Sequence, residues 1–193
     1  VGRLVPGFGE QIAEIDPLAA LRAGLEEAST DLRRSAVQAY LARCASGDDV
    51  DSDFLEPISY SGFAFDGLAD ALKPFLRTSV RREAKRAAIQ MAKDCRVEDV
   101  VPELLRLALD EAELQEIRAF AARTFVKLAK ERDRRKLKPL LKVKPEHDPD
   151  DSLLGTALAA LWPEHLSWSA LIKLIRAPRD GYIGWPYSSF LSE

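Results

Sequence analysis

Several residue types and motifs are scarce in this sequence, and each scarcity excludes a class of protein. No run approaches the roughly 18 consecutive apolar residues that a membrane helix needs, so we expect no membrane segment. The two cysteines, Cys44 and Cys95, lack the C-x-x-C spacing of zinc sites and redox motifs. We interpret both as small core residues of a protein in the reducing cytoplasm. Alternating β-branched runs are absent, so the sequence does not predict strands.

Motifs that bind phosphate or carry out catalysis are missing as well. Neither a Walker-type loop nor G-x-G-x-x-G after a strand occurs, and Gly7-Phe8-Gly9 is an isolated turn. His147 lies in the acidic loop 144–151, whose carboxylates and imidazole are possible metal ligands, but we favour a solvated loop. His165 follows Trp162-Pro163-Glu164 and has no nucleophile beside it in the sequence. We therefore predict a segment that is not an enzyme, with no catalytic residues, cofactor or metal.

The charge balance and the first residue add two expectations. The sequence has 28 basic and 31 acidic residues, a formal net charge of −3, whereas a domain devoted to nucleic acid is usually basic. It begins with Val1 and contains a single methionine, Met91, so we expect a fragment of a larger protein.

A short pattern recurs among the strong helix formers that dominate the chain. It consists of an aliphatic residue, an arginine, and an alanine three positions after the arginine, with leucine replacing arginine in the last copy. The aliphatic positions are 48, 37 and 36 residues apart, which is typical of two-helix repeats. The four copies are Leu32-Arg33-x-x-Ala36, Val80-Arg81-x-x-Ala84, Ile117-Arg118-x-x-Ala121 and Leu153-Leu154-x-x-Ala157.

Leucine-rich faces at 68–76, 101–108 and 137–141 precede the last three copies and predict the first helix of each hairpin. Small alanines in the second helices would allow close packing, and stacking would bury the apolar faces that one hairpin leaves open. The sequence thus predicts an all-α, HEAT-like α-solenoid of stacked helical hairpins over 1–193, with a long inter-repeat loop at 50–66. We expect Asp31, Ser79 and Ser152 to cap the second helices.

The sharpest local anomaly is a basic run over 127–144, with nine basic residues and two acidic ones. Such a run could bind an acidic protein surface or the phosphates of nucleic acid. It is also typical of a solvated helix end, and the acidic loop after it is expected to neutralise part of its charge. We expect a protein partner, namely another domain of the parent chain or a sensed protein, and we disfavour nucleic acid. The candidate interaction patch consists of Lys127, Lys130, Arg132, Arg134, Arg135, Lys136, Lys138, Lys142 and Lys144.

Two further groups of residues have both a structural and a functional interpretation. The repeated arginines Arg33, Arg81 and Arg118 could form a functional ladder, but we favour a structural one that ties neighbouring repeat units together, by pairing with an aspartate or a backbone carbonyl. Aromatic residues gather toward the C-terminal end, where they could anchor an interface or seal the end of the solenoid. We favour the seal. These aromatics are Trp162, Trp168, Tyr182, Trp185, Tyr187 and Phe190.

The segment 157–191 is the most distinctive part of the chain. It contains Ala157-Leu-Ala-Ala-Leu-Trp-Pro-Glu-His-Leu-Ser167, then Leu171-Ile-x-x-Ile-x-x-Pro178 and Gly184-x-x-Tyr-x-x-Phe-Leu191. This series resembles the helical, HEAT-like repeat region of bacterial NACHT/STAND-type NTPases. The resemblance implies the sensor or post-NTPase solenoid of an antiviral defence ATPase, which recognises invader components and oligomerises on ATP. The chain has no Walker residues, so the resemblance implies no catalytic residue here.

Two other functions fit parts of the sequence. A HEAT-like DNA-binding protein or DNA glycosylase would use the basic run and the tryptophans, but the acidic net charge argues against it. A general protein-interaction adaptor would use the same solenoid with no NTPase attached.

Overall fold

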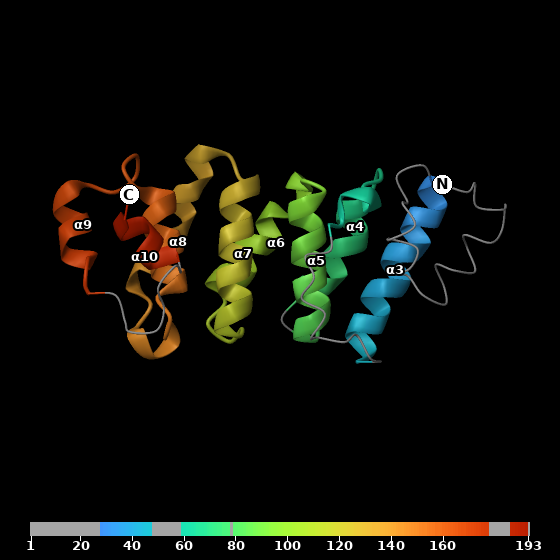
Figure 1. Cartoon of the computed structure of the whole chain (residues 1–193), viewed down its shortest axis with the longest axis horizontal. Coiled ribbons are helices and arrows are strands. Elements are labelled where there is room, and N and C mark those ends of the chain that lie inside the picture. Colours follow the sequence, from blue (N-terminus) through green and yellow to red (C-terminus); the bar gives the residue numbers. More distant parts are fainter. Residues whose placement is uncertain (1–27, 48–58, 78, 178–185, 193) are drawn as a thin grey trace. The chain divides into compact units, whose positions relative to one another are not determined.

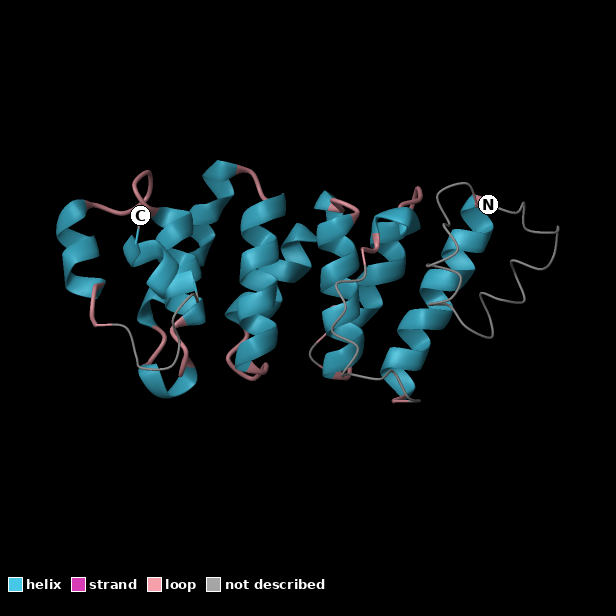
Figure 2. Cartoon of the chain, in the orientation of Figure 1, coloured by secondary structure: helices cyan, strands magenta, loops and turns pink. Residues whose placement is uncertain are grey.

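The computed structural model describes residues 28–47, 59–77, 79–177 and 186–192 (Figure 1). These residues form helices and connecting loops, with no strand among them (Figure 2). The all-α prediction is therefore confirmed for this part of the chain. No helix within it combines the length and the apolar character needed to cross a membrane.

The chain divides into two compact units, residues 1–100 and 101–193, which are described separately. Each unit contains helices that pack side by side, as hairpins of a repeat would. The arrangement of all hairpins into one solenoid over 1–193 stays a prediction.

In the first unit, α3 packs against α5, and α4 contacts both of them. Their shared core includes Leu41 of α3, Leu72 of α4 and Ile89 of α5, each 0% exposed. Helix α4 ends where Pro74 enters a 3₁₀ turn, since proline lacks the N–H that would continue an α-helix. The elements are α3 (Thr30–Ser46), η2 (Ser61–Phe63), α4 (Leu68–Leu72), η3 (Lys73–Phe75), α5 (Arg82–Asp94) and η4 (Glu98–Val100).

In the second unit, α6 and α7 form a tightly packed pair, and α8 packs against α7, η5 and α10. Because α8 has neighbours on several sides, all of its residues except Ala159 are buried. The elements are α6 (Val101–Leu109), α7 (Gln115–Leu128), η5 (Glu131–Lys142), η6 (Pro145–His147), α8 (Ser152–Leu161), α9 (Trp168–Leu174) and α10 (Pro186–Ser192).

The alanine of the recurring pattern has the same environment in every copy. Ala36, Ala84, Ala121 and Ala157 are each 0% exposed. They lie on α3 and α5 in the first unit and on α7 and α8 in the second, and these helices pack in the pairs α3 with α5 and α7 with α8. A small side chain at this position allows the two helices of each pair to approach closely.

The predicted helix caps of the first unit are wrong. Helix α3 begins earlier than expected, and the hydroxyl of Ser29 accepts the N–H of Leu32 at 3.2 Å, so Asp31 lies inside the first turn. Helix α5 begins at Arg82, and the preceding Arg81 forms no side-chain cap. Ser79 therefore lies too far upstream to cap it.

The described part of the predicted loop 50–66 contributes to the core of the first unit. Phe63, in the short helix η2, is fully buried and stacks on Tyr60. The hydroxyl of Tyr60 lies 2.8 Å from that of Tyr40 on α3, which satisfies both buried hydroxyls. Phe65 is half-buried, and its ring lies under the guanidinium of Arg34. Phe54 lies outside the described residues.

Candidate interaction surface

The basic run begins at the end of α7, follows η5 along its whole length and ends in the loop after it. Eight of its nine basic side chains are exposed. Arg134 is half-buried, and its Nε atom is shielded from solvent. Arg134 therefore differs from the rest of the predicted patch, because its side chain contributes to packing within the second unit.

Helix η5 is a 3₁₀-helix of 12 residues, although the sequence predicted an α-helical face here. A 3₁₀-helix has three residues per turn, so side chains three positions apart line up in columns. Burial follows this period from Arg134 onward: Leu137 and Leu140 are buried, and Arg134, one turn before them in the same column, is half-buried. The buried column fixes the rotation of η5, which packs against α8.

A second column points outward and is basic. Arg132, Arg135 and Lys138 are all exposed, and they occupy successive turns of η5. We call these three residues the cationic ridge. The next position in the column is Leu141, which is partly buried against the hydrophobic cluster around α8, so the basic column ends there.

The third column contains Asp133, which is paired within η5. Lys136 Nζ lies 2.8 Å from its carboxylate oxygen. This hydrogen bond, with the positive charges of Lys136, Arg132 and Arg135, lowers the pKa of Asp133 below its usual value. The carboxylate stays ionised at neutral pH and is oriented toward Lys136.

The sequence suggested that the acidic loop after η5 neutralises part of the basic run. In the structure, the three aspartates of this loop have other partners. Asp148 accepts the backbone N–H groups of Leu153 and Leu154, both at 3.0 Å. It therefore caps α8 in the place predicted for Ser152, which is the first residue of that helix. Its remaining interaction is a hydrogen bond from Gln115 Nε2 at 3.1 Å.

The two other aspartates of the loop have partners of the same kind. Asp150 accepts hydrogen bonds from Gln115 Nε2 at 2.6 Å and from the Ser152 N–H at 3.0 Å. Asp151, which is 2% exposed, forms an ion pair with Arg176. The three carboxylates thus hold the start of α8, α7 and the segment after α9 together.

The loop does not have the arrangement of a metal site. His147 is exposed, whereas Asp148, Asp150 and Asp151 are buried. Within the described ranges, no three His, Cys, Asp or Glu side chains converge as metal ligands would. His165 Nε2 lies 3.2 Å from the backbone oxygen of Glu131, which places the turn after α8 beside the start of η5.

The three repeated arginines all contact backbone carbonyls. Arg33 donates to the oxygen of Ala64, Arg81 to that of Ser46 at 3.2 Å and Arg118 to that of Ala108 at 3.3 Å. Each bond joins two segments within one unit. Arg118 is 4% exposed, so its guanidinium has little surface to offer a ligand.

The C-terminal aromatics separate into an inward group and an outward residue. Tyr187 of α10 is 2% exposed and belongs to a cluster with Leu154, Leu158 and Leu171, against which Trp162 and Phe190 also pack. The tyrosine hydroxyl donates to the carbonyl of Arg176 and accepts its N–H, both at 2.7 Å. Trp168, by contrast, is 63% exposed. Tyr182 and Trp185 lie outside the described residues.

Trp168 begins a row of apolar side chains on α9. Ile172 and Ile175 follow at intervals of four and three residues and are 56% and 42% exposed. The interval of four places Trp168 and Ile172 on one side of the helix, and Ile175 follows directly after α9 as its extended C-cap residue, while Leu171 packs inward on the cluster. We call Trp168, Ile172 and Ile175 the α9 row. From the sequence, Trp168 could be identified as a candidate surface residue. The exposure of the two isoleucines could not, because apolar residues of an amphipathic helix are by default assigned to the core.

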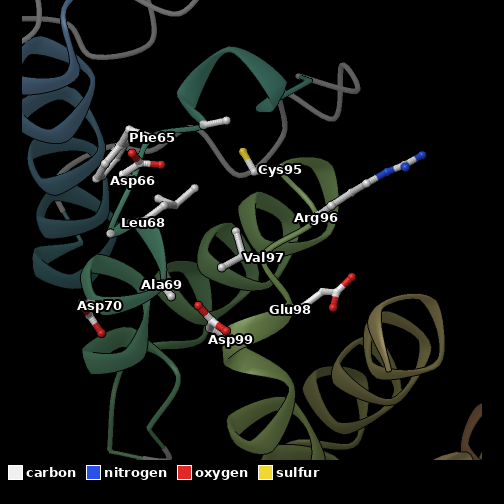
Figure 3. A pocket seen from close by; sticks show the side chains of 12 residues that line it. Phe65, Asp66, Leu68, Ala69, Asp70, Cys95, Arg96, Val97, Glu98 and Asp99 are labelled. Atoms are coloured by element: carbon white, nitrogen blue, oxygen red, sulfur yellow. The ribbon is translucent and has the colours of Figure 1, made fainter. Parts of the chain in front are cut away.

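An open pocket of about 440 Å³ lies in the first unit, between the segments 64–70 and 95–99 (Figure 3). Its polar lining is mostly acidic and exposed, and one of its carboxylates, Asp70, is paired with Lys73 at 3.1 Å. Arg96 has a positive φ of 53° and extends away from the other labelled side chains. Burial raises the pKa of the Cys95 thiol to about 11, so this thiol is a poor nucleophile at neutral pH. The pocket thus lacks an activated group.

Comparison with known proteins gives no family for this chain. No family model, curated protein or solved structure matches it. Over the described residues, the structure is that of an all-α protein.

Proposed function

We propose that this chain is a non-catalytic helical-repeat segment for recognition or scaffolding, which binds protein through the outer surface of α9. We further propose that it is the sensor or post-NTPase solenoid of a bacterial NACHT/STAND-type defence ATPase. The first proposal is supported by the α9 row, and the second by the resemblance of segment 157–191.

The α9 row has the features of a surface that another helix covers. Trp168 and Ile172 on α9, and Ile175 at its C-terminal end, are large, apolar and exposed. Helices that lie at the end of a repeat stack usually have a polar outer face, because nothing packs against them. An apolar outer face is therefore expected where a further hairpin follows, and we propose that a helical hairpin of the parent protein covers this row.

The exposure of Trp168 gives a direct test of protein binding. In a variant with Trp162→Phe and Trp185→Phe, Trp168 is the only tryptophan. Acrylamide should quench its fluorescence strongly in the 193-residue chain and much less in the longer parent protein, once the tryptophans outside this chain have also been replaced by phenylalanine. Equal quenching in both would show that nothing covers the α9 row, and would refute the proposal.

The assignment to a defence ATPase has a separate test, which is the coding sequence before Val1. We expect a Walker A motif a few hundred residues upstream in the same reading frame. A start codon within a few residues of Val1 would contradict the assignment and would favour a free-standing adaptor.

A further inference from the structure

The cationic ridge has a regular geometry that follows from the 3₁₀ conformation of η5. Each residue rises about 2.0 Å and three residues make a turn, so the side chains of Arg132, Arg135 and Lys138 leave the helix about 6 Å apart. Since the turn contains a whole number of residues, the ridge is straight and does not wind around the helix. The buried Leu137 and Leu140 hold η5 against α8, so the ridge is presented by an anchored element.

The positive charge of the ridge is left largely uncompensated by the nearest aspartates. Helix η5 contains six basic and two acidic residues. Asp133 is hydrogen-bonded to Lys136, in the neighbouring column. Asp148, Asp150 and Asp151 are buried and bind α8, Gln115 and Arg176. These four aspartates thus have hydrogen-bond or ion-pair partners outside the ridge, and with Glu131 and Asp133 counted η5 keeps a net charge of +4, six basic residues against two acidic ones.

We propose that the cationic ridge binds an extended acidic segment of a partner protein, with carboxylates at alternate residues. In an extended peptide, side chains on one face recur every second residue, about 6.6 Å apart, and they also form a straight line. In an α-helical partner, acidic residues four positions apart would drift by about 40° per step and leave the line of the ridge. Arg132 and Arg135 can each form two parallel hydrogen bonds to a carboxylate. The proposal rests on the proposed function in protein recognition and names the partner's chemistry.

Nucleic acid fits the ridge less well. Three phosphate contacts to a single strand give a salt dependence with a slope of only about −2, hence weak binding. A short acidic segment can end where the ridge ends, at Leu141.

The test measures binding of a fluorescent peptide, Ser-Asp-Ser-Asp-Ser-Asp-Ser, to the 193-residue chain by anisotropy at an ionic strength of about 0.15 M, where the Debye length is about 8 Å. The triple change Arg132→Gln, Arg135→Gln and Lys138→Gln should raise the Kd by about tenfold or more, because several exposed ion pairs are lost together. The matched control, Lys127→Gln, Lys142→Gln and Lys144→Gln, removes equal charge from the same basic run but lies off the ridge. It should change the Kd by less than about twofold. The peptide Ser-Ser-Asp-Asp-Asp-Ser-Ser should bind several-fold more weakly, since adjacent carboxylates point to opposite faces.

Three outcomes would overturn the proposal: equal losses in the two triple variants, equal affinities of the two peptides, or no measurable peptide binding. Displacement of the peptide by a lower concentration of a single-stranded oligonucleotide would also overturn it, in favour of nucleic acid. Thermal melts establish that the variants fold, and the single change Arg135→Gln replaces the triple variant if that one does not. Acrylamide quenching of Trp168 does not involve the ridge, so a failure of the proposed function can be recognised separately.

Discussion

Replacing Gly155 by alanine tests how the C-terminal helix is attached to the second unit. Gly155 lies inside α8, where the backbone of α10 crosses it. A Cβ atom at this position would lie 2.2 Å from the Tyr187 nitrogen, 2.4 Å from its Cα and 2.6 Å from the Pro186 carbonyl carbon. These are backbone atoms, which cannot rotate away as a side chain would. Helix α10 must therefore shift by more than 1 Å, roughly the amount that restores van der Waals contact, or detach.

The expected free-energy change combines two opposing effects. Alanine is favoured over glycine inside a helix by about 1 kcal/mol, so Gly155→Ala alone would stabilise α8. Displacing α10 removes Tyr187 from its cluster together with its two hydrogen bonds to Arg176. Loss of a large buried aromatic side chain costs about 3–5 kcal/mol. We therefore expect a net loss of about 2–4 kcal/mol in the free energy of unfolding.

The assay is urea unfolding followed by circular dichroism, together with amide hydrogen exchange of residues 187–192. Tyr187→Phe is the matched variant, because it keeps the ring in place and should cost about 1–2 kcal/mol through the lost hydrogen bonds. Combined with Gly155→Ala it should cost less than the sum of the two, since a displaced α10 has already lost those bonds. A Gly155→Ala chain as stable as the parent, or more stable, would refute the docking of α10 on α8.

Three other expectations concern packing, capping and thiol reactivity. Ala121→Leu should overpack α7 and lower the free energy of unfolding, measured by thermal melts, by about 1–3 kcal/mol. Ala159→Leu, on the exposed side of α8, should change it by less than about 0.5 kcal/mol. Similar melts for the two variants would mean that Ala121 faces solvent. Asp148→Ala should cost about 1–3 kcal/mol in urea unfolding, because the N–H groups of α8 that it accepts are buried, and an unchanged midpoint would show that it is not the cap. Burial raises the pKa of the Cys44 thiol to about 11, so its alkylation should be slow at neutral pH and accelerate about tenfold per pH unit toward that value. A rate that levels off near pH 8 would contradict this.

The helical class and the burial of the recurring alanines are the parts of the fold that the sequence predicted well. An alanine three residues after an arginine fits a helical period, and its small side chain indicates a close contact between helices. Both signals can be found in a short stretch of sequence. All four alanines of the pattern are fully buried. The hydrogen-bond partners of the arginines could be found only from the structure. These partners, such as Ala64 for Arg33, lie in segments distant in the sequence.

The conformation of η5 was missed, although the sequence contained a signal for it. Leu137, Leu140 and Val143 are spaced by three, and Pro139 interrupts any α-helix that would include Leu140 and Leu141. The α-helical interpretation grouped Leu137, Leu140 and Leu141 on one face. In the structure Leu141 lies in the column of the cationic ridge, and Arg134 joins the buried column. Which of the nine basic residues face solvent thus depended on the type of helix.

Whether the acidic loop neutralises the basic run depends on a second property, the burial of the start of α8. A local sequence pattern does not show this burial. A solvated helix start can leave its first N–H groups to water, but Leu153 and Leu154 are buried and need an acceptor within the protein. Ser152 is adjacent and belongs to a residue type that commonly caps helices, yet its hydroxyl does not accept these N–H groups. The carboxylate of Asp148, five and six residues upstream, accepts both of them. This requirement, and the ion pair of Asp151 with Arg176, turn the aspartates inward. The sequence of this loop suggests that it neutralises the neighbouring lysines and arginines, but its three aspartates bind α8, Gln115 and Arg176 instead.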